Sequence, residues 1–229
     1  MPDDFLDQGH KLEKHGHLDQ ALSCYDHAIQ LDAANPEAWF HRGRVLSKTE
    51  SFDLALQAYD QAIALKPDHD RAWCNKGIVL GVLDRDDEAL QALDHAISLN
   101  PQSFECLYNK GLALRDLGRL DEAIDSFDQA LAVDPQSNDA WFSKGVALRM
   151  AGTLDMAVAA IKKALVYYDE DAEAWYELAR LQVMQGLTAE AVESLKKAFA
   201  NQEDLKESIT SDEDFTTIVA LAEFTTIVA

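Results

Sequence analysis

Three histidines near the N-terminus are the residues best suited to hold a metal ion, but their spacing does not favour one. His10, His15 and His17 include no pair four residues apart, which is the spacing of two metal ligands on one helix face. No nearby cysteine completes a site. We therefore predict solvated surface histidines and no bound metal.

The motifs that mark common active sites are absent. The sequence has no phosphate-binding P-loop, GxGxxG loop, GxSxG elbow or HExxH helix. Its most concentrated acids, Asp86, Asp87 and Glu88, stand where a helix is expected to begin, and capping of free backbone N–H groups accounts for them. We expect no enzyme activity, no catalytic residues and no cofactor.

Three cysteines give no sign of redox or metal chemistry. Cys24, Cys74 and Cys106 are odd in number and show neither CxxC nor metal-ligand spacing, so we predict reduced thiols that act as small apolar side chains. The N-terminus lacks the basic and apolar regions of a signal peptide, and no apolar stretch approaches the roughly 20 residues that span a bilayer. These features predict a cytoplasmic location.

Composition and charge narrow the class of partner. The 229 residues are 48% hydrophobic and 27% charged, with only five prolines and ten glycines, which favours long helices and short connections. The formal net charge of −21 repels phosphate backbones and anionic headgroups, so we expect neither nucleic-acid binding nor membrane insertion. This acidity either serves solubility alone or steers basic partners toward the protein.

The tryptophans recur with a strict period. The spacing from Trp39 to Trp73 equals that from Trp141 to Trp175, and the interval between Trp73 and Trp141 is twice as long. Six blocks of this length, counted from residue 2, align without an insertion. Alanine fills columns 20 and 27 of all six blocks. Column 8 is small and column 24 is large: Gly9, Gly43, Gly77, Gly111, Gly145 and Ala179 against Tyr25, Tyr59, Leu93, Phe127, Ile161 and Leu195.

Each block has the pattern of two amphipathic helices. Steps of three and four residues connect columns 4, 8 and 11, and again columns 20, 24 and 27. Small residues let the helix backbones approach, and the large ones fill the remaining space. Glycines such as Gly118 and Gly152 stand in the middle of the blocks, where they are expected to end the first helix. Aspartates such as Asp121 are expected to cap the second helix, and prolines such as Pro135 to end it.

These columns resemble the tetratricopeptide repeat (TPR) family, whose repeat is a helix-turn-helix unit of about 34 residues. The resemblance implies an all-α, right-handed solenoid of six tandem repeats over 2–205, with a capping helix or tail at 206–229. The expected repeats are 2–35, 36–69, 70–103, 104–137, 138–171 and 172–205. Column 7 departs from the family, because its leucine is replaced by Gln8, Arg42, Lys76, Lys110 and Lys144.

The C-terminal tail contains a doubled hexapeptide. Phe-Thr-Thr-Ile-Val-Ala occurs at 215–220 and again at 224–229. The nine-residue offset is two and a half helical turns, so the copies would face opposite sides of one continuous helix. Two interpretations stay open: a helix that caps the last repeat, or an apolar plug that docks in a groove or on a neighbouring molecule.

By resemblance to TPR proteins, columns 2, 5, 6, 9, 12 and 13 line a concave groove. Apolar and aromatic residues occupy these columns together with arginines, four of them in columns 9 and 12 and Arg71 in column 2. They are either protein-contact anchors or packing between adjacent first helices. Related modules hold a peptide backbone with an asparagine in column 6. The candidate groove residues are Phe40, Arg44, Arg71, Asn75, Ile78, Tyr108, Asn109, Leu112, Arg115, Phe142, Val146, Arg149, Tyr176 and Arg180.

The sequence therefore supports two functions. The first is a non-enzymatic adaptor that binds a peptide or protein segment in the groove. The second is an assembly protein that self-associates through its ends and through the apolar residues within 206–229. Some TPR relatives clamp a C-terminal carboxylate with a lysine in column 5, which this chain lacks; Arg71 in column 2 is the only partial match, and with Asn75 it could still bind a carboxylate.

Overall fold

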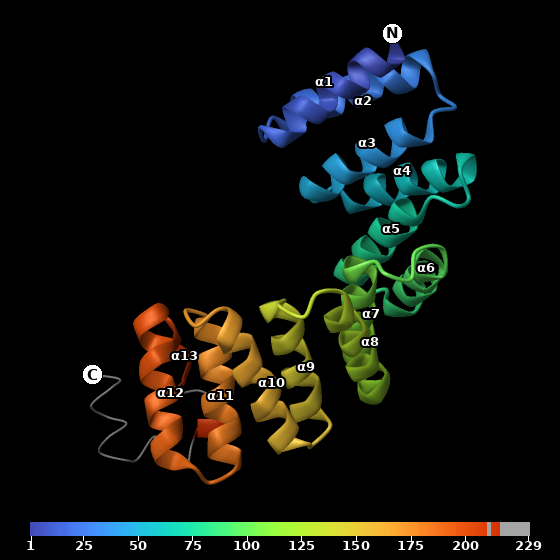
Figure 1. The fold of residues 1–229 in the computed structure, drawn as a ribbon. Coiled ribbons are helices and arrows are strands. Elements are labelled where there is room, and N and C mark those ends of the chain that lie inside the picture. The colour runs from blue at the N-terminus through green and yellow to red at the C-terminus, as the bar shows by residue number, and fades with distance from the viewer. Residues whose placement is uncertain (210–211, 216–229) are drawn as a thin grey trace. The chain divides into compact units, whose positions relative to one another are not determined.

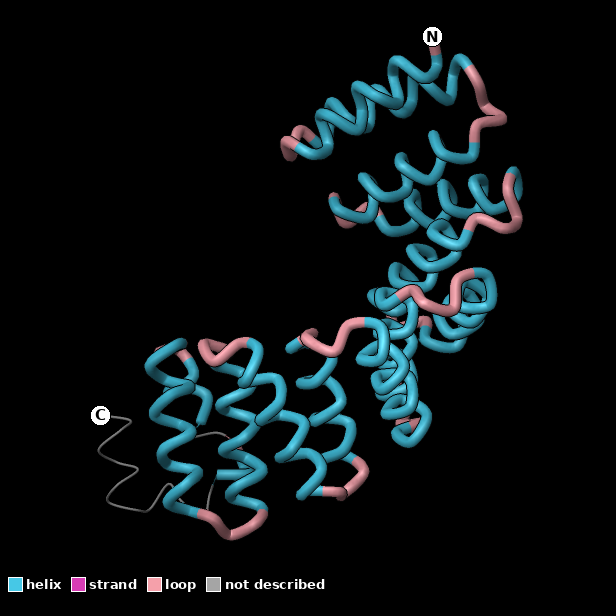
Figure 2. The backbone as a smooth tube through the Cα atoms, viewed as in Figure 1, coloured by secondary structure: helices cyan, strands magenta, loops and turns pink. Residues whose placement is uncertain are grey.

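The computed structural model of the chain describes residues 1–209 and 212–215, and every regular element in them is helical (Figure 1). The chain forms two compact units, residues 1–117 and 118–229. Figure 2 shows helices joined by short loops along each unit. The doubled hexapeptide, apart from Phe215, lies outside the described residues.

The helices follow one another in pairs along the chain. The first unit contains α1 (Pro2–Lys14), α2 (Leu18–Leu31), α3 (Pro36–Lys48), α4 (Phe52–Leu65), α5 (Asp70–Val82), α6 (Asp86–Leu99) and α7 (Phe104–Asp116). The second contains α8 (Leu120–Val133), α9 (Asn138–Met150), α10 (Leu154–Tyr167), α11 (Ala172–Met184), α12 (Thr188–Asn201), α13 (Leu205–Ile209) and the 3₁₀ turn η1 (Glu213–Phe215).

The close approach of paired helices depends on the glycines of column 8. A Cβ atom on Gly43 would lie 2.7 Å from the ring of Tyr59, and one on Gly145 would lie 2.5 Å from Ile161 Cδ1. Both distances are shorter than van der Waals contact, so the large residue of column 24 occupies the space that the glycine leaves. The sequence prediction that these two columns pack together is confirmed.

The turns inside the repeats use left-handed backbone. Gly118 and Gly152 have φ of 73° and 79°, as expected of glycines that follow a helix end. Glu50 and Asp84 stand at the same place in the second and third blocks and also have positive φ, 57° and 54°. A side chain with a Cβ is disfavoured in this conformation, so these two turns are less stable than the glycine turns.

Helix capping differs from the sequence prediction. Aspartates such as Asp121 and Asp155 were expected to cap the second helices, but they lie within the first turn. Their negative charges there interact favourably with the positive end of the helix dipole. The residues that precede α8 and α10 make no side-chain cap. The caps stand instead before the first helices, where the Asn35 side chain accepts a bond from Glu37 N at 3.0 Å, and Ser137 and Asp171 do the same for α9 and α11.

The basic residues of column 7 join neighbouring repeats. Arg42 pairs with Asp26 at 2.7 Å, and Lys76 pairs with Asp60 at 2.6 Å. Lys110 with Asp94 and Lys144 with Asp128 repeat the arrangement with the same sequence offset. These pairs are partly exposed, so each adds little stability, but they explain why a charged residue is tolerated where TPR repeats carry leucine.

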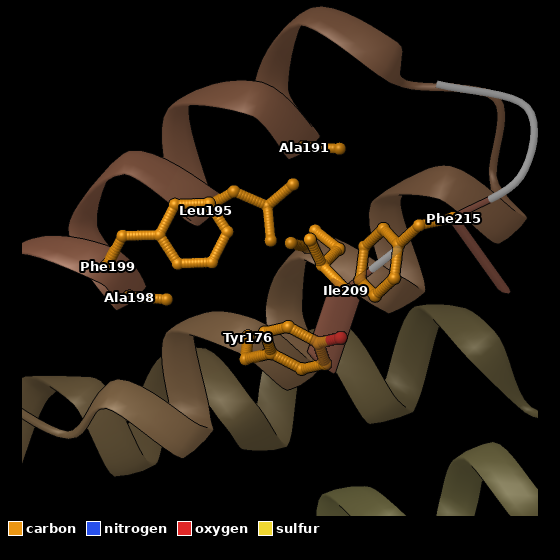
Figure 3. Close-up of a cluster of buried hydrophobic side chains, with 8 residues drawn as sticks. Tyr176, Ala191, Leu195, Ala198, Phe199, Ile209 and Phe215 are labelled. Atoms are coloured by element: carbon orange, nitrogen blue, oxygen red, sulfur yellow. The ribbon is translucent and has the colours of Figure 1, made fainter. Parts of the chain in front are cut away.

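The C-terminal segment packs on the last helix pair. Ile209 and Phe215 are fully buried in a cluster with Tyr176 of α11 and Leu195 of α12 (Figure 3). The ring centroids of Tyr176 and Phe215 are 5.0 Å apart in an edge-to-face arrangement. The described part of this segment therefore covers apolar side chains of α11 and α12 that would otherwise face water.

Candidate functional site

The first helices α3, α5 and α7 enclose a polar cavity of about 260 Å³ in the first unit. Arg71 is one of its lining residues, and the Arg71 guanidinium lies 4.6 Å from the ring centroid of Phe40. Arg71 is exposed and forms no ion pair with any residue that the structure describes. The remaining lining residues are Arg44, Asp70, Cys74, Asn75, Asn100, Ser103, Glu105 and Cys106.

The two asparagines of column 6 have the same local arrangement. Asn75 Nδ2 donates to the carbonyl of Arg71 at 3.0 Å, and Asn109 Nδ2 donates to the carbonyl of Glu105 at 2.8 Å. Each bond uses one of the two amide donors and holds the side chain along its helix. The amide oxygen can accept a hydrogen bond from a peptide backbone, and the second N–H can donate one to it.

A second cavity, of about 190 Å³, lies between α5, α6 and α7. Ile78, Asn109, Leu112 and Arg115 line it, so four of the predicted groove residues meet there. Arg115 forms an ion pair with the neighbouring Asp116 at 2.8 Å. Tyr108 lies elsewhere on α7, half-buried, with its ring stacked on Phe104 at 5.8 Å.

Phe40 and Arg44 are already engaged inside the protein. Phe40 is fully buried, so it can serve a ligand only by supporting Arg71. Arg44 Nη2 donates to Glu13 Oε2 at 2.7 Å, and Lys48 Nζ donates to Glu13 Oε1 at 2.8 Å. Burial acts to raise the pKa of Glu13, but these two cations outweigh it and lower the pKa to about 2.

Two buried histidines stand close to this region and were not singled out in the sequence. Burial lowers the pKa of His41 to about 3, assisted by the nearby charges of His10 and Arg44. Burial also lowers the pKa of His69, whose side chain accepts a bond from Ala72 N at the start of α5. Both histidines are therefore neutral near pH 7 and contribute packing and a helix cap.

The prediction of three reduced cysteines is wrong for two of them. Cys74 of α5 and Cys106 of α7 form a disulfide, with their Cα atoms 5.5 Å apart, while Cys24 is free and buried. The residues are 32 apart in the sequence, and only the stacking of successive first helices brings them together. Since disulfides are typical of oxidising compartments, the cysteines no longer support the expected cytoplasmic location.

The predicted groove residues of the second unit are largely covered. Arg149 and Arg180 both form ion pairs with the buried carboxylate of Glu177. Arg180 also reaches Asp212 at 2.8 Å, and the hydroxyl of Tyr176 donates to the same carboxylate at 2.9 Å. Phe142 is half-buried against the cluster that contains Leu148, and Val146 is half-buried as well.

An apolar cavity of about 640 Å³ on α10, α11 and α12 was not predicted. Leu165, Val166, Trp175 and Leu178 supply its apolar lining, and Lys162, Glu190 and Glu193 stand among the lining residues. Val166 is 74% exposed. The repeat pattern gave no signal for this cavity, because a valine near the end of a helix does not by itself indicate exposure, and single exposed apolar residues are common.

The profile of the tetratricopeptide repeat matches residues 6–68, 43–104, 108–166 and 154–204, which together span most of the sequence. The chain belongs to the tetratricopeptide repeat family. Its tandem helix pairs and the glycine contacts within them are those of TPR repeats. No curated protein matches the chain significantly.

Solved TPR structures share this fold. A crystal structure of MamA is 26% identical, with a TM-score of 0.66 over 75% of this chain and 94% of MamA. YrrB, described as a TPR protein with an unusual peptide-binding site, is 22% identical, with a TM-score of 0.68 over 82% of this chain and 96% of its own. PilF of Pseudomonas aeruginosa is 19% identical, with a TM-score of 0.78 over 96% of both chains.

Neither a membrane span nor a metal site occurs within the described residues. None of the described helices combines the length and apolar character needed to cross a membrane. Within the same part of the chain, no three histidine, cysteine, aspartate or glutamate side chains are grouped as metal ligands would be.

Proposed function

We propose that this TPR protein is a non-enzymatic interaction scaffold that binds an extended segment of another protein along the first helices of residues 1–117. The exposed side chain of Arg71 carries the proposal. Arg71 lines a polar cavity, and its guanidinium rests on Phe40 and has no ion-pair partner among the described residues. A planar cation held in this way suits a ligand carboxylate.

The neighbouring residues favour a peptide over a small free anion. Asn75 and Asn109 stand on successive first helices, one beside each cavity, and can bond to the backbone of a crossing segment. Ile78 and Leu112 offer an apolar surface to a side chain that follows the acidic one. The expected ligand therefore carries an acidic residue and, a few residues away, an apolar one.

Membership of the TPR family supports an interaction function, because stacked helix pairs provide extended binding surfaces. YrrB, with its peptide-binding site, is a structural neighbour of this chain. The helix pairs are regular from repeat to repeat, whereas active sites depend on irregular features that break such a pattern, so we propose no catalysis.

A random-peptide display library tests the proposal without a known partner. The wild-type chain, immobilised through its N-terminus, should enrich peptides that combine an acidic and an apolar residue. Arg71→Gln should abolish that enrichment. Arg85→Gln is the matched control, because Arg85 is an exposed arginine just before α6 that pairs with Glu88 at 2.7 Å and lines neither cavity. Equal enrichment by Arg71→Gln and the wild type would refute the site.

A further inference from the structure

The buried Phe215 is the first residue of one of two identical hexapeptides. The copies begin at Phe215 and Phe224, and each phenylalanine follows an acidic residue, Asp214 in one case and Glu223 in the other. The first phenylalanine is fully buried in the cluster of Figure 3. The chain thus carries two segments of nearly the same chemistry and one site that holds such a segment.

The Phe215 site, which comprises Tyr176, Arg180, Leu195 and Ile209 with the small residues around them, recognises both an apolar ring and acids. Phe215 packs edge-to-face on Tyr176. Arg180 Nη2 donates to Asp212 at 2.8 Å, and Arg180 Nε lies 2.8 Å from the carboxylate of Asp214. An aromatic residue preceded by acids therefore satisfies the whole site.

Alignment of the two copies shows what the second one would gain and lose. Phe224 takes the place of Phe215, and Glu223 takes the place of Asp214 beside Arg180. Leu221 then stands where Asp212 stands, so the bonds of Asp212 to Tyr176 and Arg180 have no counterpart. The second copy fits the same site with fewer charged contacts, which explains why the first copy holds it.

We propose that the Phe215 site of one molecule binds residues 221–229 of a second molecule when its own Phe215 leaves. The apolar contacts of the ring and the pairing of the preceding acid with Arg180 supply the recognition. The resident copy is tethered, and tethering gives it an effective concentration in the millimolar range, so the wild-type chain is mostly self-occupied. Loss of the resident copy converts the tail into a link between molecules.

A labelled peptide tests the recognition directly. In the full chain with Phe215→Ala and Phe224→Ala, neither phenylalanine of the tail can occupy the site. This double variant should bind the peptide Leu-Ala-Glu-Phe-Thr-Thr-Ile-Val-Ala, and fluorescence anisotropy measures the binding. Wild-type protein should bind it at least about tenfold more weakly, because the resident copy competes. Adding Arg180→Gln should weaken binding by about tenfold, and replacing the first leucine of the peptide by aspartate should strengthen it.

Association of the intact chain provides the second arm. Phe215→Ala frees the site and keeps Phe224, so it should form dimers or larger species by light scattering at concentrations where the double variant is monomeric. Phe215→Leu, which keeps an apolar side chain, should lie between Phe215→Ala and the wild type. Thermal unfolding followed by circular dichroism checks that each variant remains helical.

Three results would overturn the proposal. The first is an absence of peptide binding by the helical double variant. The second is binding that Arg180→Gln leaves unchanged, which would place the peptide elsewhere. The third is association of Phe215→Ala that persists when Phe224 is also replaced. The Arg71 cavity lies in the other unit, so failure of the tail proposal leaves the proposed function of residues 1–117 untouched.

Discussion

Arg180 of α11 and Asp212 form an ion pair with a nitrogen–oxygen distance of 2.8 Å, so an arginine expected to meet a foreign ligand instead binds the chain's own tail. The side chains are 21% and 18% exposed. The same carboxylate accepts the hydroxyl of Tyr176. The last repeat is therefore closed by a specific polar contact as well as by burial of Phe215.

Replacement of Asp212 should loosen this closure. Asp212→Asn removes the charge that faces Arg180 and should lower the free energy of unfolding by about 1.5–3 kcal/mol, because hydrogen bonds to charged groups contribute this much. Urea unfolding of both proteins measures the difference. Asp204→Asn, at an exposed site before α13, is the matched control and should change stability by less than about 0.5 kcal/mol.

The contribution of Asp212 should also depend on pH. Burial acts to raise the pKa of Asp212, but bonds from Arg180 and Tyr176 outweigh it and lower the pKa below the ordinary value of 3.8. The stabilisation is therefore present above pH 3.8 and is lost as the pH falls through the lowered value. The stability difference between the wild type and Asp212→Asn should shrink in that range, and a constant difference would contradict the ion pair.

Glu13 should dominate the acid sensitivity of the first unit. Its pKa is about 2 in the folded protein, against an ordinary 4.5, so its contribution is complete above pH 4.5 and is lost between pH 4.5 and 2. The shift corresponds to at most roughly 3 kcal/mol. Glu13→Gln should lower stability at pH 7 and flatten this part of the acid profile, while the exposed Asp7→Asn should leave both unchanged.

Replacing Glu50 or Asp84, which have positive φ although they are not glycines, by glycine should stabilise the protein. Asp84→Gly replaces a residue at φ 54° by the residue found at the same place in the fourth to sixth blocks. Because glycine adopts the left-handed conformation without strain, the free energy of unfolding should rise by about 1 kcal/mol. The greater conformational freedom of glycine in the unfolded chain makes this gain somewhat smaller. Chemical denaturation should show the gain, and Gly118→Ala should show a loss of similar size.

Reduction of the disulfide should destabilise the first unit. Cys74 and Cys106 close a loop with a sequence separation of 32, for which loop-closure entropy predicts roughly 3–4 kcal/mol. Dithiothreitol should lower the stability of the wild type but not that of Cys74→Ser. Cys24→Ala should keep the full response to reductant, since Cys24 is free; loss of the response there would mean that a different pair is bonded.

The repeated features of this protein can be predicted from its amino-acid sequence alone. Three kinds of feature recur from block to block: the contact of Gly43 with Tyr59, the left-handed turn at Gly118 and the helix end before Pro135. Because they recur, the period of the sequence predicts them. Family membership follows from the same columns. The functional surface was predicted only as a set of columns, because periodicity shows which residues lie on the same helix face but not which of them have partners inside the protein.

Which of the predicted groove residues are available to a ligand depends on contacts that form when the chain folds. Arg71 and Arg180 both lie in groove columns, yet Arg71 is without an ion-pair partner among the described residues and Arg180 is neutralised by Glu177 and Asp212. The Cys74–Cys106 bond likewise joins different columns of successive repeats. Such contacts occur once and connect residues that are distant in sequence, so no period records them, and the chain must fold before they exist.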